Sequence, residues 1–335
     1  MMLLERLCNA FGPSGCEKEI RDILLPVITP LCHKVEVDNI GNIIAFKKGA
    51  EGKRTTMLAA HMDEVGLIIK EITGDGYLKF DAVGGIDPRV LISKGVIVGK
   101  KRLNGVIGAK PKHLMGKENT ADKISDLYID IGAKDKNEAK SQVSLGEYAV
   151  FDTQFFNLEN NAVAAKALDD RAGCYILTEL MKNSYKDDIY FVFTVQEEVG
   201  CRGAKVAAYN LDVDRAIVVE GTTCADLATD RDYEFSTKSG KGGAISIFDR
   251  GSRADAKMVK GLKAAAEENN IPWQYKQTTM GGNDAGAIHI AKSGIRTAAI
   301  SVPCRYIHSP ISVASLDDIK SCIDIINAYL DRQED

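Results

Sequence analysis

The side chains best suited to chemistry in this 335-residue chain are two histidines and three acids, most of which follow apolar segments. His61 ends the run TTMLAAH, Glu198 closely follows IYFVFTVQ, and Glu220 ends RAIVVE. His308 lies in the loop after AAISVP, and Asp169 lies in ALDDRAG at the start of a predicted helix. Open α/β sheets bind ligands beyond the carboxyl ends of their strands. We therefore expect these five side chains to share one crevice.

Two imidazoles and three carboxylates form a donor set that suits zinc, cobalt or manganese and requires no thiolate. Two ions about 3.5–4 Å apart need a bridging carboxylate and further ligands on each side. Asp169 as the bridge, His61 with Glu220 on one ion, and Glu198 with His308 on the other would meet that need. The sequence thus predicts two divalent metal ions per subunit that activate a water for hydrolysis.

Two further acids stand beside these ligands. Asp63 lies two residues after His61, on the same face of an extended strand, where it can accept the second imidazole N–H and fix the tautomer. Glu197 precedes Glu198 and is left without a metal-binding role. An unbound carboxylate next to the reacting water is what a general base requires, so we assign that role to Glu197.

Each acid also has an ordinary structural interpretation. Asp169 and Asp170 would cap the helix that follows them, and the pair Glu197–Glu198 would form a solvated strand end. The histidines have such interpretations too. His61 alone resembles a buried core histidine.

His308-Ser-Pro would be a turn, and His289, on a predicted helix, is better explained as structural. For the site to be absent, the ordinary interpretations of the five ligands would all have to hold at one end of one sheet.

The elements that must position these residues are those of an α/β protein. Near-continuous apolar strands alternating with helices predict a mostly parallel mixed sheet with helices on both faces. Ser14 and Glu17 form an S-x-x-E capping box before an early helix, and Asp318 is expected to cap the last helix. Strands are expected over 35–47, 55–61, 189–195, 215–221 and 296–303, and helices over 171–183, 254–270 and from Ser315 onward.

The sequence pattern of residues 68–161 differs from that of the segments on either side. Short β-rich runs alternate there with Gly- and Asp-containing turns, and no long helical pattern interrupts them. Strands at this turn density are typical of a small barrel or sandwich. We therefore predict a β-barrel-like domain at 68–161, inserted into a catalytic α/β domain made of residues 1–67 and 162–335.

Composition narrows the function classes. The net charge of −4 and the pI near 5.9 provide no basic surface, so nucleic acid is not an expected partner. No run approaches the roughly 18 apolar residues of a membrane span, and the N-terminus does not resemble a signal peptide. None of the eight cysteines forms a C-x-x-C pair. Free thiols in a reducing compartment, hence a cytoplasmic protein, are the expectation.

Together the motifs resemble a known family. The chain looks like a TET-type dinuclear aminopeptidase, the group that includes glutamyl and deblocking aminopeptidases, some members of which carry the labels cellulase M or glucanase. The insert segment VGGIDPRVL at 83–91 also matches, so the resemblance covers essentially the full length. The matching motifs are HMDEVG at 61–66, ALDDRAG at 167–173, QEEVG at 196–200, VVEG at 218–221, GGNDA at 281–285 and YIHSP at 306–310.

The resemblance implies the same metal ligands, with Glu197 as the base and Asp63 as the acid that orients a histidine. Many members have Asp where this chain has Glu220, and Thr where it has Asn283, whose role the sequence leaves open. The resemblance further implies short peptide substrates and an inserted domain that pairs subunits. Such dimers often assemble into hollow dodecamers.

Three alternatives remain at this point. A glycoside hydrolase, such as an endoglucanase, needs two carboxyls about 5–9.5 Å apart and no metal, and the chain has only Trp273 to stack on sugars. A non-catalytic protein on the same scaffold would be expected to lack the base or a ligand. A dinuclear hydrolase of another small amide would share this site, because the site's chemistry does not fix the substrate.

Overall fold

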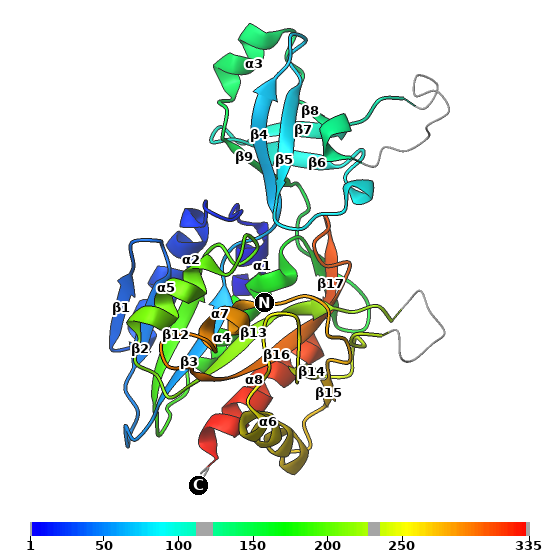
Figure 1. Ribbon diagram of the computed structural model, residues 1–335. Coiled ribbons are helices and arrows are strands. Elements are labelled where there is room, and N and C mark those ends of the chain that lie inside the picture. Colours follow the sequence, from blue (N-terminus) through cyan, green and yellow to red (C-terminus); the bar gives the residue numbers. More distant parts are fainter. Residues whose placement is uncertain (1, 112–122, 227–234, 333–335) are drawn as a thin grey trace.

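The chain forms a large mixed sheet between two layers of helices, with a closed barrel standing above one end of the sheet (Figure 1). The computed structural model describes residues 2–111, 123–226 and 235–332. No helix within these residues is long and apolar enough to span a membrane. The predicted α/β class with an inserted barrel is confirmed.

The large sheet has eleven described strands, in the order β1-β2-β12-β3-β13-β16-β17-β11-β10, with β14 paired to β16 and β15 paired to β14. Its centre is parallel, since β12, β3, β13 and β16 run in the same direction. The outer pairs are mostly antiparallel. The strands are β1 Lys34–Val37, β2 Ile43–Lys47, β3 Thr55–His61, β10 Phe156–Asn157, β11 Ala162–Ala165, β12 Asp188–Thr194, β13 Arg215–Thr223, β14 Gly243–Ser246, β15 Trp273–Tyr275, β16 Arg296–Arg305 and β17 Ser312–Ser315.

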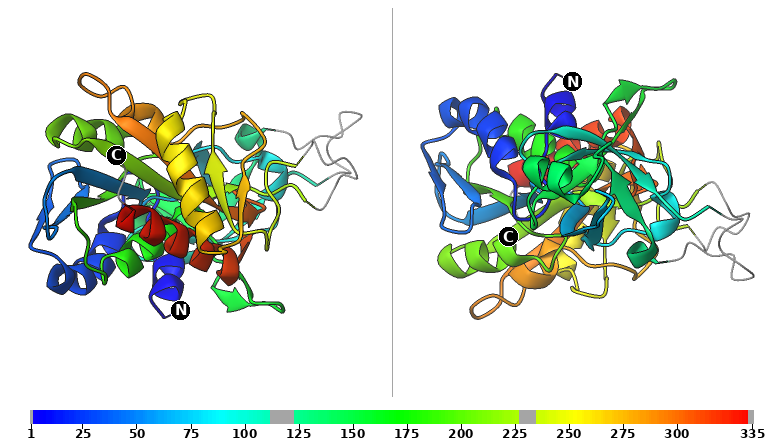
Figure 2. Two further views of the ribbon diagram at one scale, coloured as in Figure 1. Left: turned by 90° about the horizontal axis from the view of Figure 1, so that it is seen from below. Right: turned by 90° about the horizontal axis from the view of Figure 1, so that it is seen from above.

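Helices cover both faces of this sheet (Figure 2). Alternate residues of a strand point to opposite faces, so Leu58 packs in one core and its neighbour Met57 in the other. Helices α1, α2, α4, α6 and α8 bury their apolar sides in the first core, and α5 and α7 in the second. The helices are α1 Met2–Asn9, α2 Lys18–Ile28, α3 Lys136–Gln142, α4 Leu168–Leu180, α5 Arg202–Asn210, α6 Ala256–Glu268, α7 Asp284–Ile288 and α8 Leu316–Asp331.

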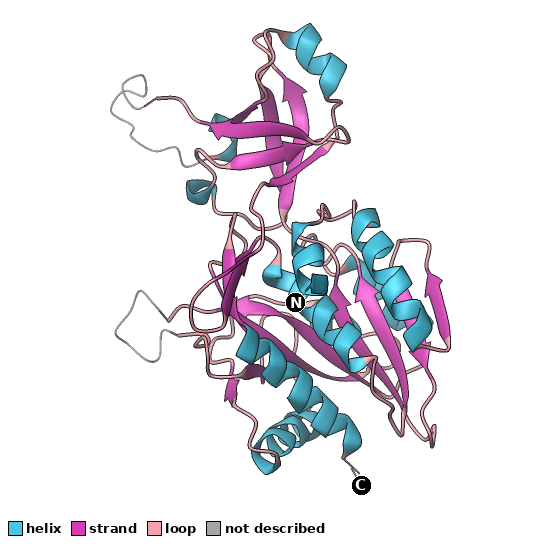
Figure 3. Cartoon of the chain, turned by 180° about the vertical axis from the view of Figure 1, so that it is seen from behind, coloured by secondary structure: helices cyan, strands magenta, loops and turns pink. Residues whose placement is uncertain are grey.

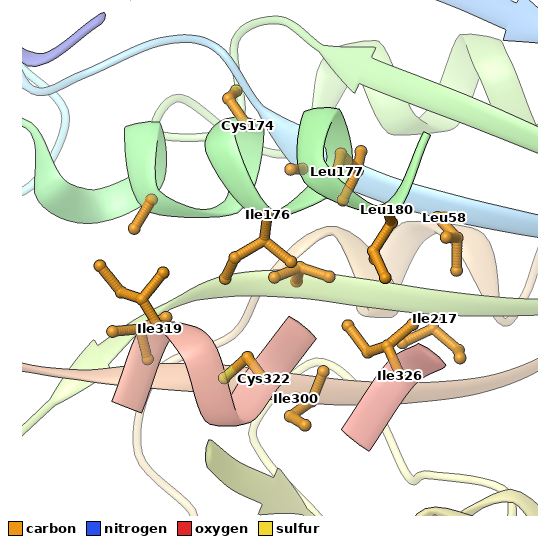
Figure 4. Packing of buried hydrophobic residues seen from close by; sticks show 14 of the residues in the cluster. Leu58, Cys174, Ile176, Leu177, Leu180, Ile217, Ile300, Ile319, Cys322 and Ile326 are labelled. Atoms are coloured by element: carbon orange, nitrogen blue, oxygen red, sulfur yellow. The ribbon is translucent and has the colours of Figure 1, made fainter. Parts of the chain in front are cut away.

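The first core lies beneath α4, the helix that carries Asp169. Figure 4 shows Ile176 and Leu180 of α4 gathered with Ile217 of β13 and with Ile319 and Ile326 of α8. All five side chains are almost completely buried. This packing holds α4 against the parallel strands. It therefore also sets the position of the first turn of α4, which carries Asp169.

The barrel closes through six antiparallel strands in the order β4-β5-β8-β7-β6-β9 and forms a separate lobe with its own apolar core (Figure 3). Its strands span residues 66–151, whereas the predicted insert spans residues 68–161. β4 begins at Gly66, and β10 already pairs with β11 in the large sheet. Residues 112–122 of the insert lie outside the described part of the chain. The barrel strands are β4 Gly66–Ile72, β5 Leu78–Val83, β6 Gly95–Val98, β7 Leu103–Gly108, β8 Tyr128–Asp130 and β9 Tyr148–Phe151.

Two local predictions were wrong. The expected strand over 35–47 is the hairpin of β1 and β2, because Asp38 Oδ1 accepts the N–H groups of Ile40, Gly41 and Asn42 and closes a turn. The last helix is capped by Ser315, whose Oγ accepts from the Asp317 N–H. The carboxylate expected to cap it, Asp318, instead accepts two backbone N–H groups from a neighbouring loop.

A buried charge cluster joins the N-terminal segment to the sheet. Both carboxylate oxygens of Glu64 lie 2.8 Å from Lys166 Nζ, and one lies 3.1 Å from Arg171 Nη2. Burial lowers the pKa of Lys166, and the Glu64 carboxylate opposes that shift. The Arg171 guanidinium also donates to the carbonyls of Met62 and Gly12. The segment 62–65, which leads from the sheet into the barrel, is therefore held by paired charges.

We expect Glu64→Gln to lower the free energy of unfolding by about 3–5 kcal/mol, because two buried cations would lose their only carboxylate partner in this cluster. Urea unfolding followed by circular dichroism measures this change. Asp22→Asn, which breaks the exposed Lys18–Asp22 pair, is the matched control and should cost less than about 1 kcal/mol. Equal effects of the two substitutions would contradict the structural role of Glu64.

Candidate metal centre

The predicted ligands lie at one edge of the sheet. His61 is the last residue of β3, Glu198 follows β12, Glu220 lies in β13, and His308 follows β16. These four strands are parallel, so their carboxyl ends meet at the same edge. Asp169 reaches that edge from the first turn of α4, where the backbone departs from helical geometry.

The Asp169 carboxylate lies between two histidines. Its Oδ1 is 3.3 Å from His61 Nε2, and its Oδ2 is 3.4 Å from His308 Nε2. Glu198 Oε2 is also 3.4 Å from His308 Nε2. Donor atoms of His61, Asp169 and Glu198 lie within 4.8 Å of one another. This mixed set of imidazole and carboxylate donors fits a divalent metal ion.

Glu220 joins this group less directly. Together with His61, Asp169, Glu197 and His308 it lines a cavity of about 390 Å³, but among the described residues no hydrogen bond or ion pair joins its carboxylate to the other four side chains. Instead, Glu220 Oε1 accepts from Asn283 Nδ2 at 2.7 Å and from Ser301 Oγ at 3.1 Å. Its second oxygen makes neither of these bonds.

Burial shapes the protonation of the centre. It raises the pKa of Glu198 and of Glu220 to about 7, and raises that of Glu197 well above its usual range. Burial alone would lower the pKa of His308, but the Asp169 and Glu198 carboxylates raise it to about 9. Several carboxyl groups are thus held where ionisation is costly without a cation.

Asp63 positions both glutamates. Its carboxylate accepts the backbone N–H of Glu197 at 3.0 Å and that of Glu198 at 3.2 Å. His61 Nδ1 lies 3.1 Å from the Asp63 carbonyl oxygen and 3.5 Å from its Oδ1. The nearest acceptor for the second imidazole nitrogen is therefore the backbone of Asp63, with its carboxylate next.

The predicted capping box at Ser14 was wrong. Helix α2 begins at Lys18, and Ser14 Oγ donates to Asp63 Oδ2 at 2.5 Å. A buried carboxylate attracts the hydroxyl more strongly than a helix end can. Glu17 instead accepts the N–H groups of Gly15 and Gln196.

The helix-capping interpretation holds for Asp170 and not for Asp169. Asp170 Oδ1 accepts the Gly173 N–H, and its Oδ2 accepts the His61 N–H. His289 Nδ1 lies 2.8 Å from the carbonyl of Ala285, one turn earlier, so the structure supports its structural role.

Asn283 is a residue whose role sequence reasoning missed. Its Nδ2 donates to Glu220 Oε1 and lies 3.3 Å from Asp249 Oδ2, while its Oδ1 accepts the Ala285 N–H. The side chain is 3% exposed. Its place in the Gly-rich segment 281–285 was the only signal, and no pattern links it to a strand 63 residues away.

The barrel reaches the centre through two glycines after β5. A Cβ on Gly84, whose φ is +88°, would lie 3.2 Å from the Cβ of Glu198, and one on Gly85 would lie 3.6 Å from His308 Nδ1. Gly85 also lines a larger cavity of about 790 Å³ with Glu197, Glu198 and His308. The backbone of the insert therefore forms part of the wall around the centre.

This combination of a mixed α/β sheet and an inserted six-stranded barrel matches the fold of a TET aminopeptidase. Residues 41–325 match the model of the M42 glutamyl aminopeptidase family. The chain belongs to this family, as the resemblance predicted, and is an aminopeptidase-type hydrolase.

Two relatives match over nearly the whole chain. A provisionally named aminopeptidase of Acetivibrio thermocellus is 40% identical, over 97% of this chain and 96% of its own length. The lysyl aminopeptidase of Pyrococcus furiosus is 32% identical, over 98% of this chain and 96% of its own.

Solved structures agree with this assignment. The TET aminopeptidase of a marine-sediment Thaumarchaeota archaeon superposes with a TM-score of 0.96 at 33% identity, covering 100% of this chain and 96% of that one. A TET peptidase of Pyrococcus horikoshii, which can assemble into a tetrahedron or a large octahedral shell, has a TM-score of 0.88 at 35% identity, covering 99% of each chain. A Thermotoga maritima structure described as an endoglucanase has a TM-score of 0.82 at 35% identity, covering 98% and 96%.

We expect Asn283→Ala to weaken metal binding by about 10- to 100-fold, the usual effect of removing a group that orients a ligand. The Glu220 carboxylate would lose its shortest hydrogen bond and keep only the longer one from Ser301. Metal content after dialysis against buffers of decreasing free zinc measures the change. Asn183→Ala, which removes an amide at the exposed Asn327 contact, is the control. Wild-type metal affinity in Asn283→Ala would contradict this role.

Proposed function

We propose that the protein is a metal-dependent aminopeptidase that removes N-terminal residues from short peptides. The observation that carries this proposal is the Asp169 carboxylate, whose two oxygens face His61 and His308 on opposite sides. Glu197, a half-buried residue outside that contact set, lines the same cavity. Membership of an aminopeptidase family supports the same activity.

Two divalent ions per subunit are proposed, zinc or cobalt in preference to manganese. Asp169 would bridge them, with His61 and Glu220 on one side and Glu198 and His308 on the other. When bound, such ions polarise a carbonyl and lower the pKa of water.

Glu197 is the proposed general base. Its carboxylate takes a proton from the attacking water and passes it to the leaving amine. Burial favours the protonated form of Glu197, and His61 opposes that shift. A carboxyl group with a raised pKa holds a transferred proton well enough to deliver it. The backbone bond to Asp63 sets where Glu197 stands.

Two cavities adjoin the centre, and the scissile peptide bond is proposed to lie where they meet. Glu197 and His308 line both cavities, so a substrate that spans the two would bring its scissile bond to these side chains. A dinuclear hydrolase of another small amide would use the same groups, and substrate tests separate the two.

The endoglucanase alternative has less support. Trp273, the one tryptophan of the chain, packs edge-on against Tyr275 at a ring distance of 4.8 Å and lines neither cavity. It is not placed to stack on a sugar at the centre.

The barrel is proposed to pair subunits, with dimers as the building block of a homo-oligomer, up to a dodecamer. Support comes from the closed shells of the Pyrococcus horikoshii peptidase and from exposed apolar side chains on the barrel, such as Val106 and Leu145. Light scattering of Val106→Lys with Leu145→Lys should then show a smaller mass than the parent chain.

All eight cysteines are free, which supports a cytoplasmic location.

Short peptides are expected to lose one residue at a time from the N-terminus when incubated with zinc- or cobalt-loaded protein. A panel of aminoacyl-p-nitroanilides ranks the preferred residue, and mass spectrometry follows the peptides. N-acetylated peptides and carboxymethylcellulose are the controls and should remain intact. Internal cuts, or equal turnover of acetylated peptides, would exclude an aminopeptidase.

Substitutions of the two neighbouring glutamates should differ in their effects on metal content and kcat. Glu197→Gln is expected to keep both ions and lower kcat by about 10²–10⁴-fold, because only the proton acceptor is lost. Glu198→Ala should lose metal from one site and lose activity with it. Metal content and kcat are measured on the same preparation of each variant. The roles are reversed if Glu197→Gln loses metal while Glu198→Ala keeps it, and near-normal kcat in Glu197→Gln refutes the mechanism.

A further inference from the structure

A second group of donor atoms adjoins the centre. Glu197, Cys201 and Asp284 each offer one atom, and these atoms lie within 4.8 Å of one another. Cys201 Sγ is 3.4 Å from Glu197 Oε1. Glu197 and Cys201 lie in one turn, where the Cys201 N–H donates to the Glu197 carbonyl, and the packing of α7 brings its first residue, Asp284, to them.

One oxygen of this group lacks a partner. Asp284 is 1% exposed, and its Oδ2 accepts from Thr194 Oγ1 at 2.5 Å. Its Oδ1 is buried and has no hydrogen-bond partner among the residues that the structure describes. A buried carboxylate oxygen without a donor is costly. A cation among these three side chains would satisfy it.

The group is open to solutes on one side. Cys201 is half-buried, and with Glu197 it lines the 790 Å³ cavity beside the centre. Zinc binds sulfur at about 2.3 Å and carboxylate oxygen at about 2.0–2.2 Å, so its ligand atoms stand roughly 3.5 Å apart. The Glu197–Cys201 distance already matches that spacing.

We propose that Glu197, Cys201 and Asp284 form an inhibitory site for one soft divalent ion, such as zinc in excess or cadmium. As the sulfur–metal bond forms, the thiol proton leaves to solvent. The ion holds the Glu197 carboxylate and so removes it as a proton acceptor. The inhibitory effect rests on the proposed role of Glu197, whereas the binding of the ion does not.

The sulfur distinguishes this site from the proposed catalytic ions, whose five ligands include no thiolate. Cadmium chloride alone, titrated into protein already loaded with its two ions, should bind as one further equivalent. Binding should produce thiolate-to-cadmium charge-transfer absorption in the ultraviolet and a parallel loss of peptidase activity. Cadmium exchange into the catalytic positions would give no such absorption.

Cys201→Ala should abolish the absorption and raise the cadmium concentration for half-inhibition by more than about tenfold, the scale of losing a group around a metal. Inhibition is measured relative to each variant's own activity without cadmium, because Cys201 Sγ contacts the Glu197 carboxylate. Asp284→Asn should weaken cadmium binding while keeping the Thr194 contact. Cys16→Ala, at a half-buried thiol lining a different cavity, is the matched control and should behave as the parent.

Absence of the absorption in the parent, or its persistence in Cys201→Ala, overturns the site. Absorption that depends on Cys201 but leaves activity unchanged overturns the inhibition and counts against Glu197 as the base. If the metal-loaded protein has no peptidase activity, the proposed function fails, yet the absorption still decides whether the ion binds.

Discussion

Both oxygens of the Asp169 carboxylate face a histidine, and the rest of the centre is arranged around that carboxylate. Its Oδ1 also accepts the Gly221 N–H of β13 at 3.1 Å. A Cβ on Gly221 would lie only 2.8 Å from the Cβ of Asp169, so the close approach of Asp169 requires a residue without a side chain at this position of the strand. One side chain from α4 thus contacts β13 and the residues that end β3 and follow β16. This contact requires the close packing of α4 on the parallel strands.

Two of the carboxylates buried around Asp169, those of Asp63 and Glu220, accept hydrogen bonds from neutral donors. Backbone N–H groups and a serine hydroxyl hold Asp63, and Asn283 and Ser301 hold Glu220. Buried acids need hydrogen bonds or cations to offset lost hydration. Neutral donors orient the oxygens without cancelling their charge, which leaves that charge available to a metal ion. By contrast, Glu64 is neutralised by Lys166 and Arg171 and serves stability.

The inserted barrel is not only a separate lobe, because the segment that follows its strand β5 forms part of the wall around the centre. Its chain enters at 62–65, directly after His61, and the glycines after β5 lie against Glu198 and His308. Any movement of the barrel relative to the sheet would therefore change the wall of the 790 Å³ cavity. Subunit pairing through the barrel, as proposed, would fix that wall in position.

The sequence by itself determined the α/β class, the strand at 55–61 and the edge where His61, Asp169, Glu198 and His308 meet. These follow from apolar patterns and from the common direction of parallel strands. Only the tertiary structure decided the partners of Ser14 and Asn283 and brought Asp284 close to Cys201. Ser14 donates to an acid 49 residues away, and Asn283 to one 63 residues away. Such contacts depend on strand register and on helix packing across the sheet, which residue type and local spacing do not specify.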